Sequence, residues 1–345
     1  MDTIKLGSTG LTVSRTGFGC LPMQRVSFDE AKELLLYAFE HGVTFFDTAR
    51  GYTDSEAKLG YAFSGMREKI VIATKSGAKT GAALEADLET SLKELGTDYI
   101  DVYQFHNTPF VPMPGGADGL YDAALRAKAA GKIRHIGITS HSLARATQAV
   151  ESGLFETLQF PFNHLSTAGE IALVKLCREK NVGFICMKGM SGGLVTNARI
   201  PFAYIRQFEN AVPIWGIQRM REIEEFIAYS ENPPMLTDAL LAEIEKDRKE
   251  LSGAFCRGCG YCLPCPVGIP IQMANRMREL LARSPSDNWL SPMWREGMEK
   301  IEDCTKCGAC EKKCPYGLKP FETLPTQLAA YRAFIAQADA SWSHT

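Results

Sequence analysis

The sequence predicts an α/β protein: a (β/α)8 barrel of the TIM type, followed by a small, mostly α-helical domain. Three observations predict this. In the first two thirds of the chain, short apolar segments recur about every 25 to 35 residues, which is the length of one strand–helix unit. Longer amphipathic stretches separate them. Around Asn232–Glu250 this rhythm is lost, and most of the cysteines follow.

The apolar segments number eight, as a closed parallel barrel requires. An open doubly wound sheet is the alternative, but no G-x-G-x-x-G motif follows the first strand. The expected strands are Thr16–Cys20, Val43–Thr48, Ile70–Lys75, Ile100–His106, His135–Thr139, Thr157–Phe162, Gly183–Lys188 and Ala211–Gly216.

Helices are expected between these strands, and several end at a glycine that suits a C-terminal cap. They include Phe28–His41, Ala82–Leu95, Gly119–Ala130, Ser142–Ser152 and Glu170–Lys180, with Gly42, Gly96, Gly131 and Gly153 at the ends of the first four. Ahead of the first strand, Lys5–Ser14 predicts a short hairpin that covers the bottom of the barrel.

We expect the domain boundary where the strand rhythm is lost, near Pro233 and Pro234. The expected domains are residues 1–235, the barrel, and 236–345, the helical domain. A charged helix over Thr237–Leu251 and further helices over Ile269–Arg283 and, after Pro325, over Thr326–Ala338 are predicted in the second domain.

The bulk composition is that of an ordinary globular protein, with 45% hydrophobic and 23% charged residues among 345. A formal net charge of -2 argues against nucleic acid or an anionic membrane as a partner. No apolar run approaches the roughly 20 residues of a membrane helix, and no signal peptide is expected at the N-terminus. We therefore expect a cytoplasmic protein.

Eight of the 11 cysteines form two runs. The first is Cys256-x-x-Cys259-x-x-Cys262-x-x-Cys265-Pro, and the second is Cys304-x-x-Cys307-x-x-Cys310-x-x-x-Cys314-Pro. Three thiolates at this spacing can hold three irons of one 4Fe-4S cluster, and in two-cluster ferredoxins the last cysteine of each run binds the other cluster.

This pattern predicts two 4Fe-4S clusters. One takes Cys256, Cys259, Cys262 and Cys314, and the other takes Cys304, Cys307, Cys310 and Cys265. A pair of structural zinc sites is the alternative, but zinc has no use for the third cysteine and the Cys-Pro. The first run is one residue shorter before its last cysteine than the usual pattern.

Four polar residues are expected at the mouth of the barrel, where the carboxyl ends of parallel strands meet and active sites lie. Asp47, Lys75 and His106 end three successive strands, and Tyr52 follows the first of them. A carbonyl that accepts a hydride needs a proton, which a tyrosine can supply when an ammonium stabilises its phenolate. Lys75 would stabilise the phenolate, Asp47 would hold Lys75, and His106 would orient the carbonyl.

The segment Phe45–Glu56, with Asp47 and Tyr52, resembles the signature of the aldo-keto reductase family, as do Leu6–Leu11, Gly17–Gly19, Ile72–Lys75 and Tyr99–His106. The cysteine-rich remainder is similar to the subgroup with a fused ferredoxin-like domain. The resemblance, which covers about Ile4 to Phe226, implies the catalytic tetrad Asp47, Tyr52, Lys75 and His106, and a nicotinamide cofactor.

The resemblance also implies which residues bind that cofactor. Gly19 and Cys20 would lie near the nicotinamide ribose, and Asp47 would also contact the cofactor. Ser140 and Gln159 would hold the carboxamide, and Met187, with Lys188 and Gly189 after it, would pack on the ring. Gly216, Gln218 and Arg219, with Arg221 nearby, would bind the adenosine phosphates. An arginine there suits a 2′-phosphate, so we expect NADP(H) rather than NAD(H).

The function expected from the sequence is hydride transfer between a nicotinamide and a small carbonyl or alcohol substrate. The clusters would be structural or would exchange electrons with a redox partner protein. Two other functions stay open: a redox-neutral isomerase or lyase on the same barrel, and an iron–sulfur electron-transfer module in which the barrel is only a platform.

Overall fold

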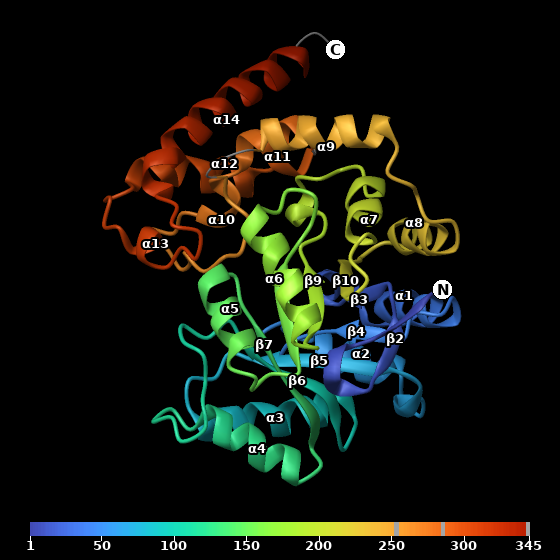
Figure 1. The fold of residues 1–345 in the computed structure, drawn as a ribbon. Helices are drawn as coiled ribbons and strands as arrows, with labels where there is room; N and C mark the ends of the chain where they lie inside the picture. Colours follow the sequence, from blue (N-terminus) through green and yellow to red (C-terminus); the bar gives the residue numbers. More distant parts are fainter. Residues whose placement is uncertain (252–254, 284–286, 343–345) are drawn as a thin grey trace. The chain divides into compact units, whose positions relative to one another are not determined.

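A computed structural model of the chain describes residues 1–251, 255–283 and 287–342. By the contacts between residues, the chain divides into two compact units. The barrel unit comprises Met1–Gly189 and Arg199–Leu241, and the C-terminal unit comprises Met190–Ala198 and Ala242–Thr345. Each unit is described by itself below, and Figure 1 labels their helices and strands.

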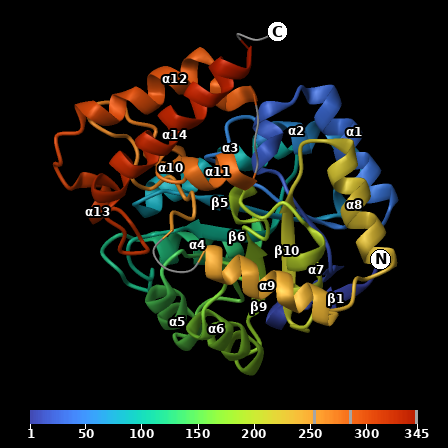
Figure 2. The ribbon, with the colours of Figure 1, turned by 90° about the horizontal axis from the view of Figure 1, so that it is seen from above.

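The barrel unit is built on a closed parallel barrel of eight strands, ordered β10-β3-β4-β5-β6-β7-β8-β9. The ring closes through β10, which pairs with both β3 and β9. Seen from above in Figure 2, strands such as β5, β6 and β10 lie inside a ring of helices. The strands are β3 (Gly17–Gly19), β4 (Phe45–Asp47), β5 (Val71–Ser76), β6 (Ile100–His106), β7 (Ile133–Thr139), β8 (Thr157–Pro161), β9 (Gly183–Met187) and β10 (Ala211–Gly216).

Each of these strands coincides with one of the expected strands, and Ile100–His106 and Ala211–Gly216 are matched at both ends. The (β/α)8 barrel is thus confirmed. The strand residues are apolar in long runs because a parallel strand is covered on both faces. In β6, for example, every residue before His106 is buried.

Helices follow the strands, and their ends use the expected signals. Ser27 and Glu30 form a capping box at the start of α1, as Thr167 and Glu170 do for α6. Gly96 ends α3 with φ 62°, the left-handed conformation that glycine adopts without strain. The helices are α1 (Phe28–Glu40), α2 (Ser55–Ala62), α3 (Gly81–Leu95), α4 (Leu120–Ala129), α5 (Leu143–Glu151), α6 (Ala168–Glu179), α7 (Arg199–Ile205) and α8 (Met220–Glu231).

The bottom of the barrel is closed by the N-terminal hairpin, as expected. Strands β1 (Thr3–Lys5) and β2 (Thr12–Ser14) pair in antiparallel fashion. Leu6 and Val13 of the hairpin belong to one buried cluster with Phe45, Val102 and Ile185 from barrel strands. The fit is tight, because a Cβ on Gly183 would lie 2.8 Å from Leu6. The open end of the barrel is therefore the one where the strands end.

The C-terminal unit contains helices and irregular loops, and no strand among its described residues. Its helices are α9 (Asp238–Glu250), which begins in the barrel unit, α10 (Ile271–Ala274), α11 (Met277–Arg283), α12 (Pro292–Glu299), α13 (Ala309–Lys312) and α14 (Pro320–Trp342). The helix expected over 269–283 is thus two helices, because the chain turns at Asn275 and Arg276.

The last helix, α14, begins at Pro320, earlier than the expected start at Thr326. Pro325 lies inside α14 and does not precede it. A proline there removes one backbone hydrogen bond. The helix nevertheless continues, because Leu324, Leu328 and Tyr331 are buried along one side of it, and this packing outweighs the lost bond.

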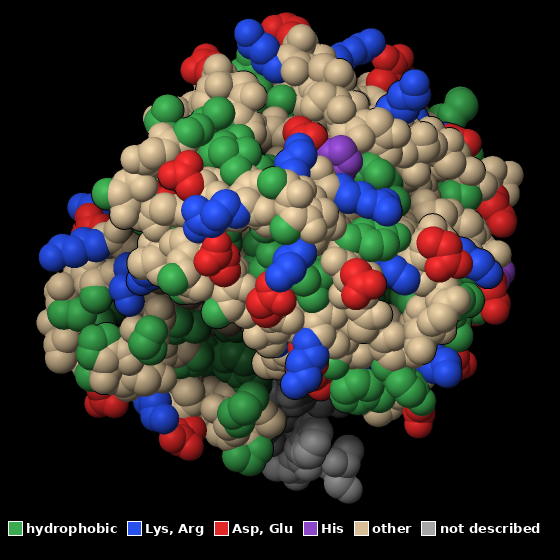
Figure 3. Space-filling model, turned by 90° about the horizontal axis from the view of Figure 1, so that it is seen from below, with side chains coloured by type: hydrophobic (Ala, Val, Ile, Leu, Met, Phe, Trp, Pro, Cys, Tyr) green, Lys and Arg blue, Asp and Glu red, His purple; other side chains and the backbone are tan. Residues whose placement is uncertain are grey.

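Positive and negative side chains alternate over the molecular face shown in Figure 3, and neither sign forms a broad patch there. Among the described helices, none has the length and apolarity needed to span a membrane. The mixture of charges on this face agrees with the formal net charge of -2.

Candidate functional site

The centre of the candidate site is a buried ion pair between neighbouring strands. Asp47 is the last residue of β4 and Lys75 is next to last on β5, so the barrel places them at its open end. Lys75 Nζ donates to Asp47 Oδ1 at 2.7 Å and to the carbonyl oxygen of Thr48 at 2.6 Å. Burial raises the pKa of Asp47, and the positive charge of Lys75 opposes this shift.

Two glutamines surround the same carboxylate inside the barrel. Gln104 Nε2 donates to Asp47 Oδ2 at 3.4 Å and to Gln159 Oε1 at 3.0 Å, and Gln159 Nε2 donates to Asp47 Oδ1 at 3.4 Å. All three side chains are buried. Asp47 is therefore fixed by one ammonium and two amides, and its rotation is restrained from three strands.

Two aromatic rings complete the group. The Tyr52 ring lies in the turn after β4, and its centre is 5.9 Å from that of His106 with the planes at 81°. Lys75 Nζ is 5.3 Å from the centre of the Tyr52 ring. Burial, and then the charge of Lys75, lower the pKa of His106 to about 3. At neutral pH this imidazole is uncharged and can donate one N–H.

The other residues expected near the nicotinamide lie around the same rim. The Cys20 N–H bonds the Asp47 carbonyl at 2.8 Å, and the Ser140 N–H bonds the Gln159 carbonyl at 3.0 Å. Gly189 packs on Trp215, since a Cβ there would lie 2.4 Å from the indole ring. The remaining members are Gly19 at the end of β3, Met187 at the end of β9, and Lys188, which has φ 59°.

A second group of expected residues follows β10. Gly216 ends that strand, and Gln218 and Arg219 precede α8. The N–H groups of Gln218 and Arg219 donate to the carboxylate of Glu222, at 2.9 Å and 3.1 Å. Arg25 reaches Gln218 Oε1 at 3.4 Å. Two exposed guanidinium groups and one capping carboxylate therefore surround the start of α8.

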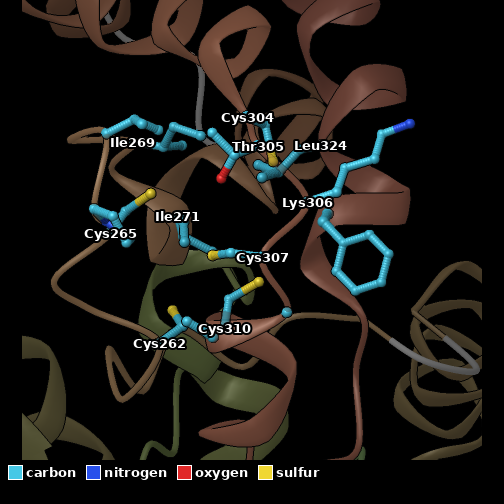
Figure 4. Close-up of a pocket in the computed structure, with 15 residues that line it drawn as sticks. Cys262, Cys265, Ile269, Ile271, Cys304, Thr305, Lys306, Cys307, Cys310 and Leu324 are labelled. Carbon is cyan, nitrogen blue, oxygen red and sulfur yellow. The ribbon is translucent and has the colours of Figure 1, made fainter.

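The second cysteine run lines a cavity in the C-terminal unit. Cys304, Cys307 and Cys310 line it together with Cys265 and Cys262, and the cavity contains about 390 Å³ of empty space, part of it open to solvent. Figure 4 shows their side chains around this space. Two cysteines of the first run thus lie with the second run, Cys262 and Cys265, whereas the crossed assignment expects only Cys265 there.

The other two cysteines of the first run adjoin Cys262. Cys256 and Cys259 lie close enough to Cys262 to raise the pKa of its thiol, which burial raises most, to about 12. Arg257 stacks on Tyr316 with 4.9 Å between its guanidinium carbon and the ring centre, and this contact joins the run to the segment that carries Cys314.

The spacing of the two cysteine runs is that of iron–sulfur ligands. Among the described residues, no three or more His, Cys, Asp or Glu side chains converge as closely as a single metal ion requires. A structural zinc site is a compact tetrahedron of ligands, whereas a 4Fe-4S cluster holds its cysteines farther apart. The cavity lined by cysteines of both runs is what the cluster pattern predicts.

Sequence reasoning missed three polar residues of the barrel site. Gln104 holds Asp47, Asn107 Oδ1 accepts from the His141 N–H at 3.1 Å, and Asn163 Nδ2 donates to the Lys188 carbonyl at 3.0 Å. Gln104 could have been found, because residues two apart on a strand share a face and it stands two before His106. The two asparagines follow strands, and their spacing alone gives no such signal.

Comparisons with known proteins identify a family for each of two parts of the chain. Residues 15–213 match the profile of the aldo/keto reductase family, and residues 255–319 match that of the 4Fe-4S dicluster domain. Among curated relatives, the aldo-keto reductase yakc [NADP(+)] of Schizosaccharomyces pombe is 31% identical over 225 residues, which cover 57% of this chain. They cover 64% of that protein, which is less than two thirds of its length.

The NADH-specific methylglyoxal reductase of Escherichia coli is 27% identical over 245 residues, covering 62% of this chain and 75% of that protein. Among solved structures, an aldo-keto reductase from Klebsiella pneumoniae in complex with NADPH superposes with a TM-score of 0.62 at 20% identity, covering 71% of this chain and 95% of that one. This likeness shows the shared barrel fold.

Proposed function

The chain belongs to the aldo/keto reductase family of oxidoreductases, and on this premise we propose that it interconverts an aldehyde or ketone and the corresponding alcohol with a nicotinamide cofactor. The observation that carries the proposal is the convergence of Asp47, Tyr52, Lys75 and His106 at the open end of the barrel. A nicotinamide bound there would supply or accept the hydride.

Tyr52 is proposed as the proton donor to the substrate oxygen. The ammonium of Lys75 lies 5.3 Å from the centre of its ring, and a positive charge at that range makes loss of the phenol proton easier. His106 is uncharged because its pKa is about 3, so it would orient the substrate oxygen through an N–H without competing as the acid. The two roles fall to different side chains.

Asp47 is proposed to keep Lys75 in place. Its carboxylate accepts from the ammonium at 2.7 Å, and Gln104 and Gln159 hold the carboxylate in turn. Pre-organised groups of this kind lower the cost of reaching the transition state, because they need not reorient during the reaction.

For the cofactor, the proposal is NADP(H), with NAD(H) as the alternative. Met187 ends β9 at the rim, followed by Lys188 and Gly189, and its thioether side chain would pack on the nicotinamide ring. At the proposed adenosine end of the cofactor site, the guanidinium groups of Arg25 and Arg219 lie close to Gln218. They offer two positive charges against the one negative charge of Glu222. That excess favours a 2′-phosphate.

The eight cysteines of the C-terminal unit are proposed to hold two 4Fe-4S clusters, with Cys265 and Cys314 exchanged between the runs. Such clusters exchange single electrons, so a redox partner protein is proposed as well. The concentration of thiols also suits a reducing compartment, which supports a cytoplasmic location.

The test is Tyr52→Phe, with Tyr61→Phe as the matched control, since Tyr61 is an exposed phenol that bonds Asp29. We expect Tyr52→Phe to reduce kcat for NADPH-dependent reduction of methylglyoxal and 4-nitrobenzaldehyde by about 10²- to 10⁴-fold, with the Kd for NADPH nearly unchanged. The protein should be purified and assayed without oxygen.

Full activity of Tyr52→Phe would remove the proposed acid. A wild-type protein that binds nicotinamide tightly and converts its substrate without net change of NADPH would favour the isomerase or lyase. A protein that binds no nicotinamide, and whose clusters turn over against a partner, would favour the electron-transfer module.

A further inference from the structure

Arg276 is a buried cation in the C-terminal unit. It lies in the turn between α10 and α11, and only 2% of its surface is exposed. Its Nη2 donates to the carbonyl oxygens of Ser191 at 2.7 Å and Gly192 at 3.0 Å. Its Nε is buried without a hydrogen-bond partner, and within the described part of the chain no carboxylate forms an ion pair with it. Both of these hydrogen bonds thus go from the cation to carbonyl oxygens, while Cys256 and Glu279 act on it only through their charge.

The guanidinium lies directly beside the first cysteine run. A Cβ on Gly258 would lie 2.1 Å from Arg276 Nη1, and a Cβ on Gly192 would lie 2.9 Å from the same atom. Glycines on both sides therefore leave the room that this side chain occupies. The Gly258 N–H in turn donates to Cys256 Sγ at 3.4 Å. Arg276 and Cys256 are also close enough to interact electrostatically.

A buried, unpaired cation is costly unless something nearby is negative. The thiolates of Cys256, Cys259 and Cys262 would supply that charge when they hold a cluster. We propose that Arg276 raises the reduction potential of the cluster bound by this run, and that its bonds to Ser191 and Gly192 keep the charge at a fixed place. This inference rests on the assignment of the run to a cluster.

The electrostatics follow from charge balance. A 4Fe-4S core of charge +2 with four thiolates has a net charge of -2, and one electron from a reductant takes it to -3 without bond cleavage or proton transfer. The guanidinium stays protonated throughout. A fixed positive charge stabilises the -3 state more than the -2 state, and the low polarity of a buried site strengthens the effect. Removing the charge therefore makes the cluster harder to reduce.

The two carbonyl bonds make Arg276 a positioning residue for the Met190–Ala198 segment too. That segment follows Gly189 in the chain and belongs to the C-terminal unit. A lysine at 276 would keep the charge but could not reproduce the planar fork that spans two carbonyls. Charge and geometry can thus be separated by substitution.

The experiment is an EPR-monitored dithionite titration of the full chain, reconstituted without oxygen, for wild type, Arg276→Gln and Arg276→Lys. Arg278→Gln is the matched control, because Arg278 is exposed and bonds Glu279. Iron content and absorbance of each protein are measured first. At the wild-type midpoint we expect the ratio of reduced to oxidised cluster to fall about tenfold in Arg276→Gln, a downward shift of about 59 mV.

Only one of the two cluster signals should shift, and Arg276→Lys and Arg278→Gln should both stay within about threefold of the wild-type ratio. An Arg276→Gln protein with full iron and wild-type midpoints would overturn the proposal. If that variant does not retain iron, Arg276→Lys decides, because a tenfold fall with the charge still present would contradict a charge effect. A wild-type chain without iron would instead refute the cluster assignment.

Discussion

Lys75 Nζ and Asp47 Oδ1 are 2.7 Å apart, with 1% and 3% of their side chains exposed. Each charge has lost its water, so each depends on the other and on the amides around it. The pair connects the buried carboxylate of Asp47 to the proposed proton donor Tyr52, because the ammonium that bonds Asp47 also faces the Tyr52 ring.

Lys75→Met is expected to destabilise the protein by about 3–5 kcal/mol, because it leaves the carboxylate of Asp47 buried without a cation. The double variant Asp47→Asn with Lys75→Met should recover most of that loss, since it removes both charges. Urea unfolding of the single and double variants measures this. Both should lack carbonyl reduction. A double variant no more stable than Lys75→Met would show that the pair is not coupled.

Gln104→Leu should release Asp47 and Gln159 from their shared donor, whose two bonds are 3.4 Å and 3.0 Å long. We expect a loss of about 1–3 kcal/mol of stability, the cost of leaving a buried polar group unpaired. The kcat should fall while the Kd for the cofactor changes little. Gln148→Leu on the exposed face of α5 is the control. Unchanged kcat in Gln104→Leu would show that Gln104 does not position Asp47.

The lowered pKa of His106 predicts how the stability of the folded protein changes in acid. Its pKa falls from 6.5 to about 3 in the folded protein, so between these values the unfolded chain binds a proton that the folded chain does not. Stability from this residue is therefore complete above pH 6.5 and is lost as pH falls toward 3. Between pH 7 and pH 5 the contribution is at most about 2 kcal/mol.

His106→Gln should accordingly show a shallower loss of stability between pH 7 and pH 5 than wild type, measured by urea unfolding. The exposed His41, changed to Gln, is the control and should leave the slope alone. An equal slope in wild type and His106→Gln would mean that the histidine is not held neutral.

Arg219→Gln tests the choice of cofactor. Loss of one guanidinium beside the start of α8 should raise the Kd for NADPH by about 5- to 50-fold, as expected for one charge-assisted hydrogen bond, and should leave the Kd for NADH within twofold. Tryptophan fluorescence during titration measures both. Arg178→Gln, on an exposed residue of α6 that pairs with Glu209, is the control and should leave both Kd values unchanged. Equal effects on both cofactors would count against a 2′-phosphate site.

Cys265→Ala tests the crossed assignment of the cysteines. This residue lines the cavity of the second run, so its loss should cost the cluster of that run and lower the iron content from about eight to about four atoms per chain. Cys177→Ala, a buried barrel cysteine, should keep all the iron. If Cys265→Ala instead spared the second cluster and lost the first, the crossing would be wrong.

Much of the barrel was predictable because its signals are local. A fully covered strand such as Ile100–His106 is a short apolar run, and Gly96 marks the end of a helix by its backbone alone. Once the strands were predicted, Asp47, Lys75 and His106 could be placed together, because the carboxyl ends of neighbouring parallel strands lie at the same end of a barrel.

The features that the sequence did not predict depend on tertiary packing. Pro325 indicates a helix start, yet the buried face of α14 carries the helix through it. Gln104 and Gln159 face each other only because β6 and β8 bring them into the same barrel interior. Arg276 shows no sign of burial in the sequence, because its partners are backbone carbonyls about 85 residues away in the chain.

The Met190–Ala198 segment comes from the middle of the barrel sequence but belongs to the C-terminal unit. The two units are therefore interlaced along the chain and are not consecutive modules. Cutting the gene after Leu241 would remove Arg276 and leave the carbonyls of Ser191 and Gly192 without their donor. An exchange of C-terminal units between related proteins would have to carry this nine-residue segment along, since it packs with the far end of the chain.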